Sequence, residues 1–139
     1  MKLTKILIGI PTLWYGIVPP IIDFSTSHVL NPNWIGHARF HMVWLLILKM
    51  FLSFFSMILI IKKIPNEVLG LRIGGLISLS VYLAFFISTL SMNLYGGTLR
   101  DNNGIPPVFG IDTNVLVFIP LSILLIIGIY RSFSLPYKK

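Results

Sequence analysis

Two histidines, His37 and His41, stand four positions apart where a long apolar run begins. If that segment is helical, both imidazoles lie on one face, about 6 Å apart along the helix axis. Two neutral imidazoles one turn apart can hold a divalent metal. His28 or Asp23 would complete a three-ligand site with an open position, which suits a catalytic or transported metal. The pattern therefore predicts a metal site formed by His37, His41 and His28.

The same residues also support two interpretations without a metal. Histidine exchanges a proton near neutral pH, so His37 and His41 could act with Asp23 as catalytic acid and base, or bind a substrate. Alternatively, both histidines are interfacial residues that bond to the loop backbone, or form a proton-sensitive pair. The motif is less specific than H-E-x-x-H because no carboxylate lies between the histidines. All three interpretations stay open.

Polar and aromatic side chains near the histidines are candidates for binding a substrate. Asn31-Pro32-Asn33 predicts a turn, with Asn33 as the N-cap of a helix that begins near Trp34. Arg39 points roughly opposite the histidines, toward a lipid phosphate, or it holds an acidic side chain or anionic headgroup through two hydrogen bonds. The predicted substrate-binding residues are His28, Asn33, Trp34, Arg39, Lys49, Asn93 and Asp112.

Lys49 is the most unusual single residue, because it lies about 12 Å below His41 along an ideal helix. A charge at such a depth costs about 2.5 kcal/mol or more and normally faces a bundle interior or a wet cavity. Either its side chain extends toward the outer surface, or it is buried beside a polar partner. For serine and threonine partners we favour a role in joining helices. The third apolar run offers a polar stripe, with Asn93 nearest the outer face: Ser78, Tyr82, Thr89 and Asn93.

A long polar connection follows the third apolar run, over residues 95–112. Gly96-Gly97 permits a sharp exit from the preceding helix. Asp112 or Asn114 is expected to cap the fourth helix. The connection is either a lid over the histidine cluster or an ordinary link between two helices.

The composition identifies the scaffold that must position these residues. The chain has 139 residues, of which 55% are hydrophobic and 11% are charged, whereas a soluble domain carries about 25% charged residues. It therefore has too little polar surface for a water-soluble globular protein and is too apolar for a disordered chain. Its net charge of +7 indicates contact with a membrane surface rather than with nucleic acid. The absence of cysteine excludes disulfides, thiolate ligands and cysteine nucleophiles.

Four apolar runs are each near the length of about 20 residues that crosses a bilayer core. Inside lipid each run must be helical, because only then are its backbone groups satisfied within the segment. The chain is therefore predicted to be an all-α integral membrane four-helix bundle, a single transmembrane domain over residues 1–139. The first span is expected to be retained rather than cleaved, because no small-residue cleavage site follows it. The spans cover about residues 5–22, 34–61, 69–94 and 114–130.

The basic residues predict the orientation of the bundle, because cytoplasmic loops carry an excess of lysine and arginine. Both termini and the short loop near residues 62–67 are placed in the cytoplasm, with the protein in a cell membrane, most simply a bacterial inner membrane. The longer loops lie outside, with all three histidines and three of the four acidic residues. Eight of the eleven basic residues carry this prediction: Lys2, Lys5, Lys62, Lys63, Arg72, Arg131, Lys138 and Lys139.

Residues 31–41, which read Asn-Pro-Asn-Trp-Ile-Gly-His-Ala-Arg-Phe-His, resemble a signature of small four-span membrane proteins of uncharacterised function. In size and span number the chain is also similar to the DoxX-like proteins and to the four-helix sterol-isomerase and sigma-2-receptor (EXPERA) superfamily. The latter resemblance implies a membrane cavity with acidic and histidine residues that is open to lipophilic molecules. It assigns no catalytic residue, because the carboxylates that this superfamily uses within its spans are absent here.

Three functions remain open from the sequence. The first, slightly preferred, is an enzyme or binder that acts on a small lipophilic molecule at the outer leaflet, with or without a divalent metal. The second is a transporter or accessory subunit with a proton or metal path that includes Lys49. The third is a structural membrane component whose polar outer face docks a partner. Membrane lipid, a lipophilic ligand, a second copy or a membrane protein are the expected partners, and nucleic acid is not.

Overall fold

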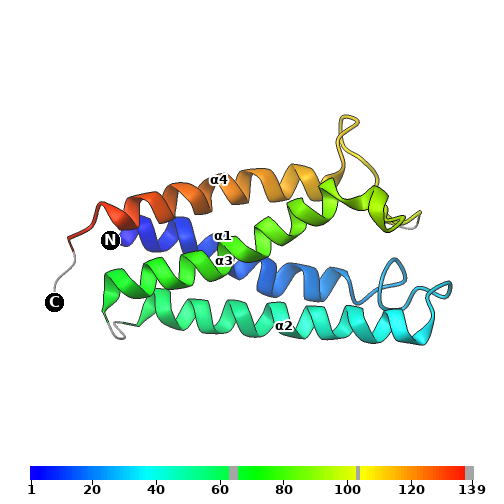
Figure 1. Cartoon of the computed structure of the whole chain (residues 1–139), viewed down its shortest axis with the longest axis horizontal. Helices are drawn as coiled ribbons and strands as arrows, with labels where there is room; N and C mark the ends of the chain where they lie inside the picture. Colours follow the sequence, from blue (N-terminus) through cyan, green and yellow to red (C-terminus); the bar gives the residue numbers. More distant parts are fainter. Residues whose placement is uncertain (63–65, 103, 137–139) are drawn as a thin grey trace.

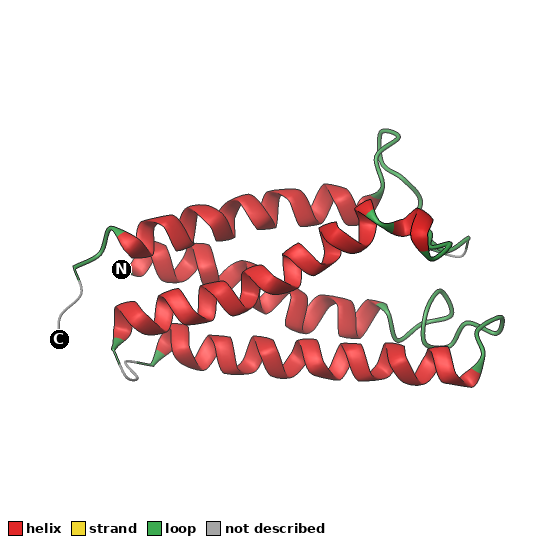
Figure 2. Cartoon of the chain, in the orientation of Figure 1, coloured by secondary structure: helices red, strands yellow, loops and turns green. Residues whose placement is uncertain are grey.

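The computed structural model describes residues 1–62, 66–102 and 104–136, and it confirms the all-α prediction. Each of four packed helices is long and apolar enough to span a membrane. Figure 2 shows how little of the described chain lies outside helices. The helices are α1 (Lys2–Ile22), α2 (Gly36–Ile61), α3 (Glu67–Leu90) and α4 (Thr113–Phe133), with a short 3-10 helix, η1 (Met92–Leu94), after α3.

The two ends of the bundle differ in character (Figure 1). The start of α1 and the end of α4 lie at one end, which we call the terminal end, and the connections 23–35 and 91–112 lie at the opposite loop end. Three basic residues of the orientation prediction, Lys63, Lys138 and Lys139, lie outside the described residues. The other five basic residues of that prediction are described, and all of them lie at or near the ends of helices at the terminal end. This agrees with the predicted gathering of basic residues on one side of the membrane: Lys2, Lys5, Lys62, Arg72 and Arg131.

The start of α2 differs from the sequence prediction. The helix begins at Gly36 with Ile35 as its N-cap, so the predicted start at Trp34 and the predicted cap Asn33 are both wrong. Asn33 is exposed, and its backbone N–H donates to Oδ1 of Asn31 at 2.9 Å. The predicted turn does form, but Asn31 stabilises it through a local side-chain bond, which delays the helix.

The other helix ends follow the expected physical chemistry more closely. The Asp112 carboxylate accepts a hydrogen bond from the Asn114 backbone N–H at 2.9 Å, which confirms the predicted cap of α4. The Asn66 side chain caps α3 by accepting from the N–H groups of Val68 and Leu69, a cap that the sequence analysis missed. The α3 helix ends at Leu90, four residues earlier than predicted, because the chain tightens into η1.

A belt of buried hydroxyl groups joins α1, α2 and α3 near the middle of the bundle. The hydroxyl oxygens of Thr12 and Ser78 are 2.7 Å apart. Ser53 Oγ donates to the Thr12 carbonyl at 2.8 Å, and Tyr82 OH donates to the Pro11 carbonyl at 2.9 Å. Buried polar groups are costly unless they are hydrogen-bonded, so this hydroxyl belt stabilises one register between the helices. The joining role predicted for Ser78 is confirmed.

Small residues on α3 permit a close approach to α2 on the terminal side of the hydroxyl belt. A methyl group on Gly74 would lie 2.9 Å from the backbone carbonyl oxygen of Ser56. On the loop side of the belt, α3 contacts α4 through aromatic rings, with Phe85 stacked on Phe118 at a centroid distance of 4.0 Å. The α2–α3 contact at Gly74 is therefore made by backbone, whereas the α3–α4 contact at Phe85 is made by side chains.

Gly74→Ala should destabilise the bundle by about 1–3 kcal/mol, the usual cost of overpacking, because the opposing Ser56 oxygen is backbone and cannot rotate away. Gly36→Ala is the matched control, since a methyl group at Gly36 meets no atom within 4 Å. Thermal unfolding of both variants in one detergent measures the difference. Equal unfolding midpoints for the two variants would contradict the close approach of α2 and α3.

Candidate functional site

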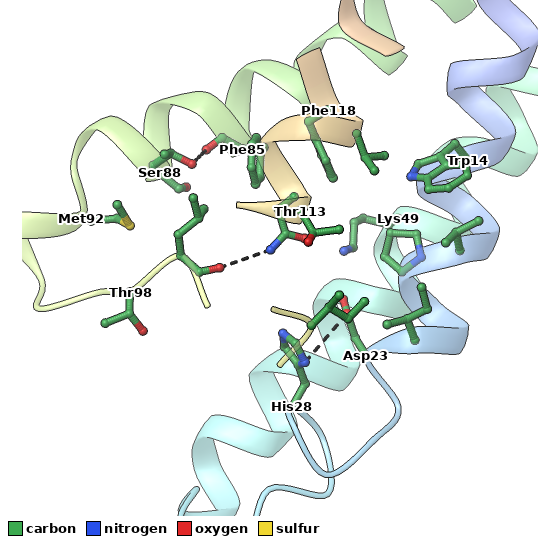
Figure 3. Close-up of a pocket in the computed structure, with 18 of the residues that line it drawn as sticks. Trp14, Asp23, His28, Lys49, Phe85, Ser88, Met92, Thr98, Thr113 and Phe118 are labelled. Atoms are coloured by element: carbon green, nitrogen blue, oxygen red, sulfur yellow. Dashed lines mark hydrogen bonds and ion pairs between the residues drawn. The ribbon is translucent and has the colours of Figure 1, made fainter. Parts of the chain in front are cut away.

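A cavity of about 330 Å³ lies at the loop end, where all four helices and the 91–112 connection contribute to its wall (Figure 3). One part of the wall is apolar and includes large rings from three helices, Trp14, Phe85 and Phe118. The polar part brings two residues of the 23–35 connection, Asp23 and His28, together with Lys49 of α2, and the sequence analysis had selected all three.

Lys49 reaches the cavity from α2, a helix long and apolar enough to span the membrane. Its side chain is half-buried, and in Figure 3 its ammonium group points into the space between Thr113 and Asp23. Among the described residues it forms no hydrogen bond and no ion pair. A charge at this depth requires a polar space inside the bundle. The Lys49 side chain thus lines a cavity to which all four helices contribute, but without the directly bonded polar partner that the buried alternative of the sequence analysis includes.

Asp23 directly follows α1, and only 18% of its side chain is exposed. The Val29 backbone N–H donates to the Asp23 carbonyl at 3.1 Å, which folds the loop back toward the helix end. As a result, Nδ1 of His28 lies 3.9 Å from Oδ1 of Asp23. Burial raises the pKa of Asp23, and the positive charges of His28 and Lys49 oppose this effect less strongly. The carboxyl group therefore retains its proton to a higher pH than an ordinary aspartate.

His28 is held in place by two neighbours from its own connection. Its Nδ1 atom is 2.8 Å from the Ser27 hydroxyl oxygen. Trp34 lies edge-on to the imidazole, with the ring centroids 6.0 Å apart. Trp34 was predicted to bind a substrate directly, but in the structure it packs against His28 and does not line the cavity.

The two connections at the loop end are fastened to each other over the cavity. Asn31 Nδ2 donates to Oδ2 of Asp101 at 3.0 Å, and Arg39 donates to the Asn31 carbonyl at 2.8 Å. Asn114 Nδ2 donates to the Leu99 carbonyl at 3.2 Å. Leu99 also lines the cavity. The 91–112 connection, predicted as either a lid or a plain link, thus forms part of the cavity wall.

His37 and His41 lie outside the cavity, exposed on the first turns of α2. They share one face as their spacing predicts, with their Nε2 atoms 3.0 Å apart. His41 also lies against Trp44, at a ring-centroid distance of 5.8 Å. The predicted catalytic set of His37, His41 and Asp23 is therefore divided between two places.

The described part of the chain contains no group of three or more His, Cys, Asp or Glu side chains placed to hold a metal ion. His28 lies beside Asp23 in the cavity, whereas His37 and His41 bond to each other outside it. The three histidines predicted as metal ligands are thus not brought together. Proton exchange and direct binding are the chemistries that the arrangement of Asp23 and His28 supports.

The remaining predicted residues lie at the edge of the site or away from it. Asn33 and Asn93 are exposed, and Asp112 serves as the cap of α4. The sequence analysis missed the aromatic wall, because an apolar residue in a span gives the same signal whether it faces lipid or a cavity. Trp14, Phe85 and Phe118 all line the cavity, and none of them was selected from the sequence as a candidate site residue.

Comparison with known proteins identified no family, since no family model, no curated protein and no solved structure matched this chain. The membrane character therefore stands on the four helices, and the function must be argued from the geometry of the cavity. The resemblances noted in the sequence contribute no residue assignment to that argument.

The raised pKa of Asp23 predicts a pH dependence of stability. When the folded-state pKa of a carboxyl exceeds its unfolded value, its stabilising contribution is complete below the unfolded pKa. It is lost as the pH rises through the folded pKa. Asparagine imitates the protonated side chain and does not titrate. As the pH rises above 3.8, the ordinary pKa of an aspartate, the wild type should lose stability relative to Asp23→Asn, so the unfolding midpoint of Asp23→Asn should rise relative to that of the wild type.

Thermal unfolding across a pH series measures this difference, with Asp112→Asn as a control for removing one carboxylate from the loop end. The Asp112 side chain caps α4, and asparagine retains that capping ability. A difference between Asp23→Asn and the wild type that stays constant with pH would refute the burial of the Asp23 carboxylate.

Proposed function

We propose that this membrane protein binds a small lipophilic molecule in the cavity at the loop end. The position of Lys49 carries the proposal, because a charged group on a membrane-spanning helix faces a cavity with aromatic walls. The apolar part of the molecule would contact Phe85 and Phe118, and its polar part would lie near Lys49 and Asp23.

The size and lining of the cavity support a small molecule as its occupant. Its volume of about 330 Å³ is at the lower end of the range of about 300–1,000 Å³ that small-molecule sites occupy. Such sites are mostly apolar, with a few polar groups that orient the ligand. The aromatic wall and the three polar residues Asp23, His28 and Lys49 match that description. The volume favours a compound much smaller than a phospholipid.

The charge distribution supports an extracytoplasmic location for the cavity. Described basic residues concentrate at the terminal end, and the positive-inside rule places that end in the cytoplasm. The loop end, with the cavity, then faces the outer leaflet. A lipophilic molecule dissolved in that leaflet would be at the level of Asp23 and Lys49.

Asp23 and His28 also equip the cavity for proton exchange with a bound molecule. A carboxyl group with a raised pKa and an imidazole nitrogen 3.9 Å away are groups that general acid–base catalysis uses. For an acid–base reaction on a bound molecule, we propose these two groups as the proton donor and acceptor. Binding alone is the function that requires the fewest further steps.

Native mass spectrometry of protein purified in a mild detergent tests the proposal. The wild type should retain a small lipophilic molecule, and Lys49→Met should retain about tenfold less, because a hydrogen bond to a charged group contributes about 1.5–3 kcal/mol. Lys62→Met is the matched control, since Lys62 is exposed just beyond the end of α2. Equal retention by both variants would contradict a site at Lys49.

A second pair of variants distinguishes the cavity from the exposed histidines of α2. His28→Ala should weaken retention, because His28 lines the cavity, whereas His41→Ala should leave it unchanged. The reverse result would place the site at His37 and His41. A wild-type protein that retains no molecule would count against the binding proposal and favour the structural or accessory role.

A further inference from the structure

The cavity contains two groups of opposite formal charge that do not pair directly. The positive charge of Lys49 acts on Asp23, yet the two side chains form no ion pair in the described structure. The nearest basic atom paired with the Asp23 carboxylate is Nδ1 of His28, at 3.9 Å, which is beyond hydrogen-bond distance. Each charged group therefore has hydrogen-bonding capacity that protein atoms leave unused.

Several other polar groups on the cavity wall already donate to the backbone. Three hydroxyl groups that line the cavity donate to backbone carbonyl oxygens: Thr89 at 2.9 Å, Tyr95 at 2.7 Å and Thr113 at 2.9 Å. A ligand that used these donors would have to break an existing bond. The charged ends of Lys49 and Asp23, by contrast, face the cavity without a direct hydrogen bond to the described residues, and a bond to a charged group contributes more than a bond between neutral groups.

We infer that the molecule bound under the proposed function carries an uncharged head that both accepts and donates a hydrogen bond, as an alcohol or phenol hydroxyl does. The hydroxyl oxygen accepts from the Lys49 ammonium group, and its O–H donates to the Asp23 carboxylate. Both bonds are charge-assisted, which makes them roughly twice as strong as bonds between neutral groups. One oxygen atom thus bridges the two side chains that the fold leaves apart.

The balance of charge disfavours the alternatives. Lys49 and Asp23 carry opposite formal charges, which cancel. A carboxylate ligand would pair with Lys49 but bring a second negative charge toward Asp23, and an amine would do the opposite. An uncompensated charge in a poorly hydrated site is strongly unfavourable. An ether oxygen would still accept from Lys49, but an ether has no hydrogen-bond donor for the Asp23 carboxylate.

Trp14 provides a fluorescent reporter within the cavity wall, once Trp34 and Trp44 outside it are replaced by phenylalanine. Four probes with the same chain differ only in their heads: decanol, decyl methyl ether, decanoate and decylamine. Titration of each probe in detergent should show the tightest binding for decanol. Loss of its hydrogen-bond donor in the ether should weaken binding about tenfold.

Two variants test whether the head contacts both charged groups. Lys49→Met and Asp23→Asn should each weaken decanol binding, and each should reduce the preference for decanol over the ether. Methionine suits an apolar span, so Lys49→Met is expected to fold. His41→Ala is the control outside the cavity and should not change any of the four affinities.

The outcomes separate this inference from the proposed function on which it rests. Tighter binding of decanoate or decylamine than of decanol would overturn the uncharged head while retaining a lipophilic binding site. Equal binding of decanol and its ether would refute a hydroxyl bridge between Lys49 and Asp23. If no probe binds and the purified wild type also retains no molecule, the proposed function fails as well.

Discussion

The loop end of this protein depends on one constraint, the need to accommodate a lysine within a membrane-spanning helix. Lys49 cannot face lipid at low cost, so the bundle must supply a polar space at its level. That space exists because α1 ends at Asp23, at the edge of the same cavity, and because the 91–112 connection covers it. The shape of the loop end follows from where this single charge sits in α2.

The hydroxyl belt and the cavity lie in different parts of the bundle. In the middle, the hydroxyl belt joins three helices through bonds that are complete within the protein. On the terminal side, Gly74 allows α3 and α2 to approach closely, and on the loop side Phe85 of α3 stacks on Phe118 of α4. A cavity at the loop end is therefore compatible with a well-packed bundle, because the belt is hydrogen-bonded independently of the cavity residues.

The sequence predicted the membrane scaffold well because hydrophobic length alone determines which segments can cross lipid. It also singled out Lys49, Asp23 and His28, whose charge or polarity is anomalous beside apolar runs. It did not separate these residues from His37 and His41, since a spacing of four shows that two residues share a helix face but not which face meets the bundle. The contribution of the 91–112 connection depends on long-range bonds such as Asn31 to Asp101, for which a single sequence gives no signal.

The difference between the hydroxyl belt and the charged cavity explains why function is assigned to the cavity. Every belt contact ends on another protein group, so packing alone accounts for it. Buried charges contribute little to stability, and apolar residues of similar size often replace them without loss. The attraction between Lys49 and Asp23 should stabilise the fold even less than a direct ion pair would, because the two side chains attract each other without contact. A bundle that had only to fold would be served as well by a leucine at position 49. The proposed ligand of the cavity would account for the cost of this lysine.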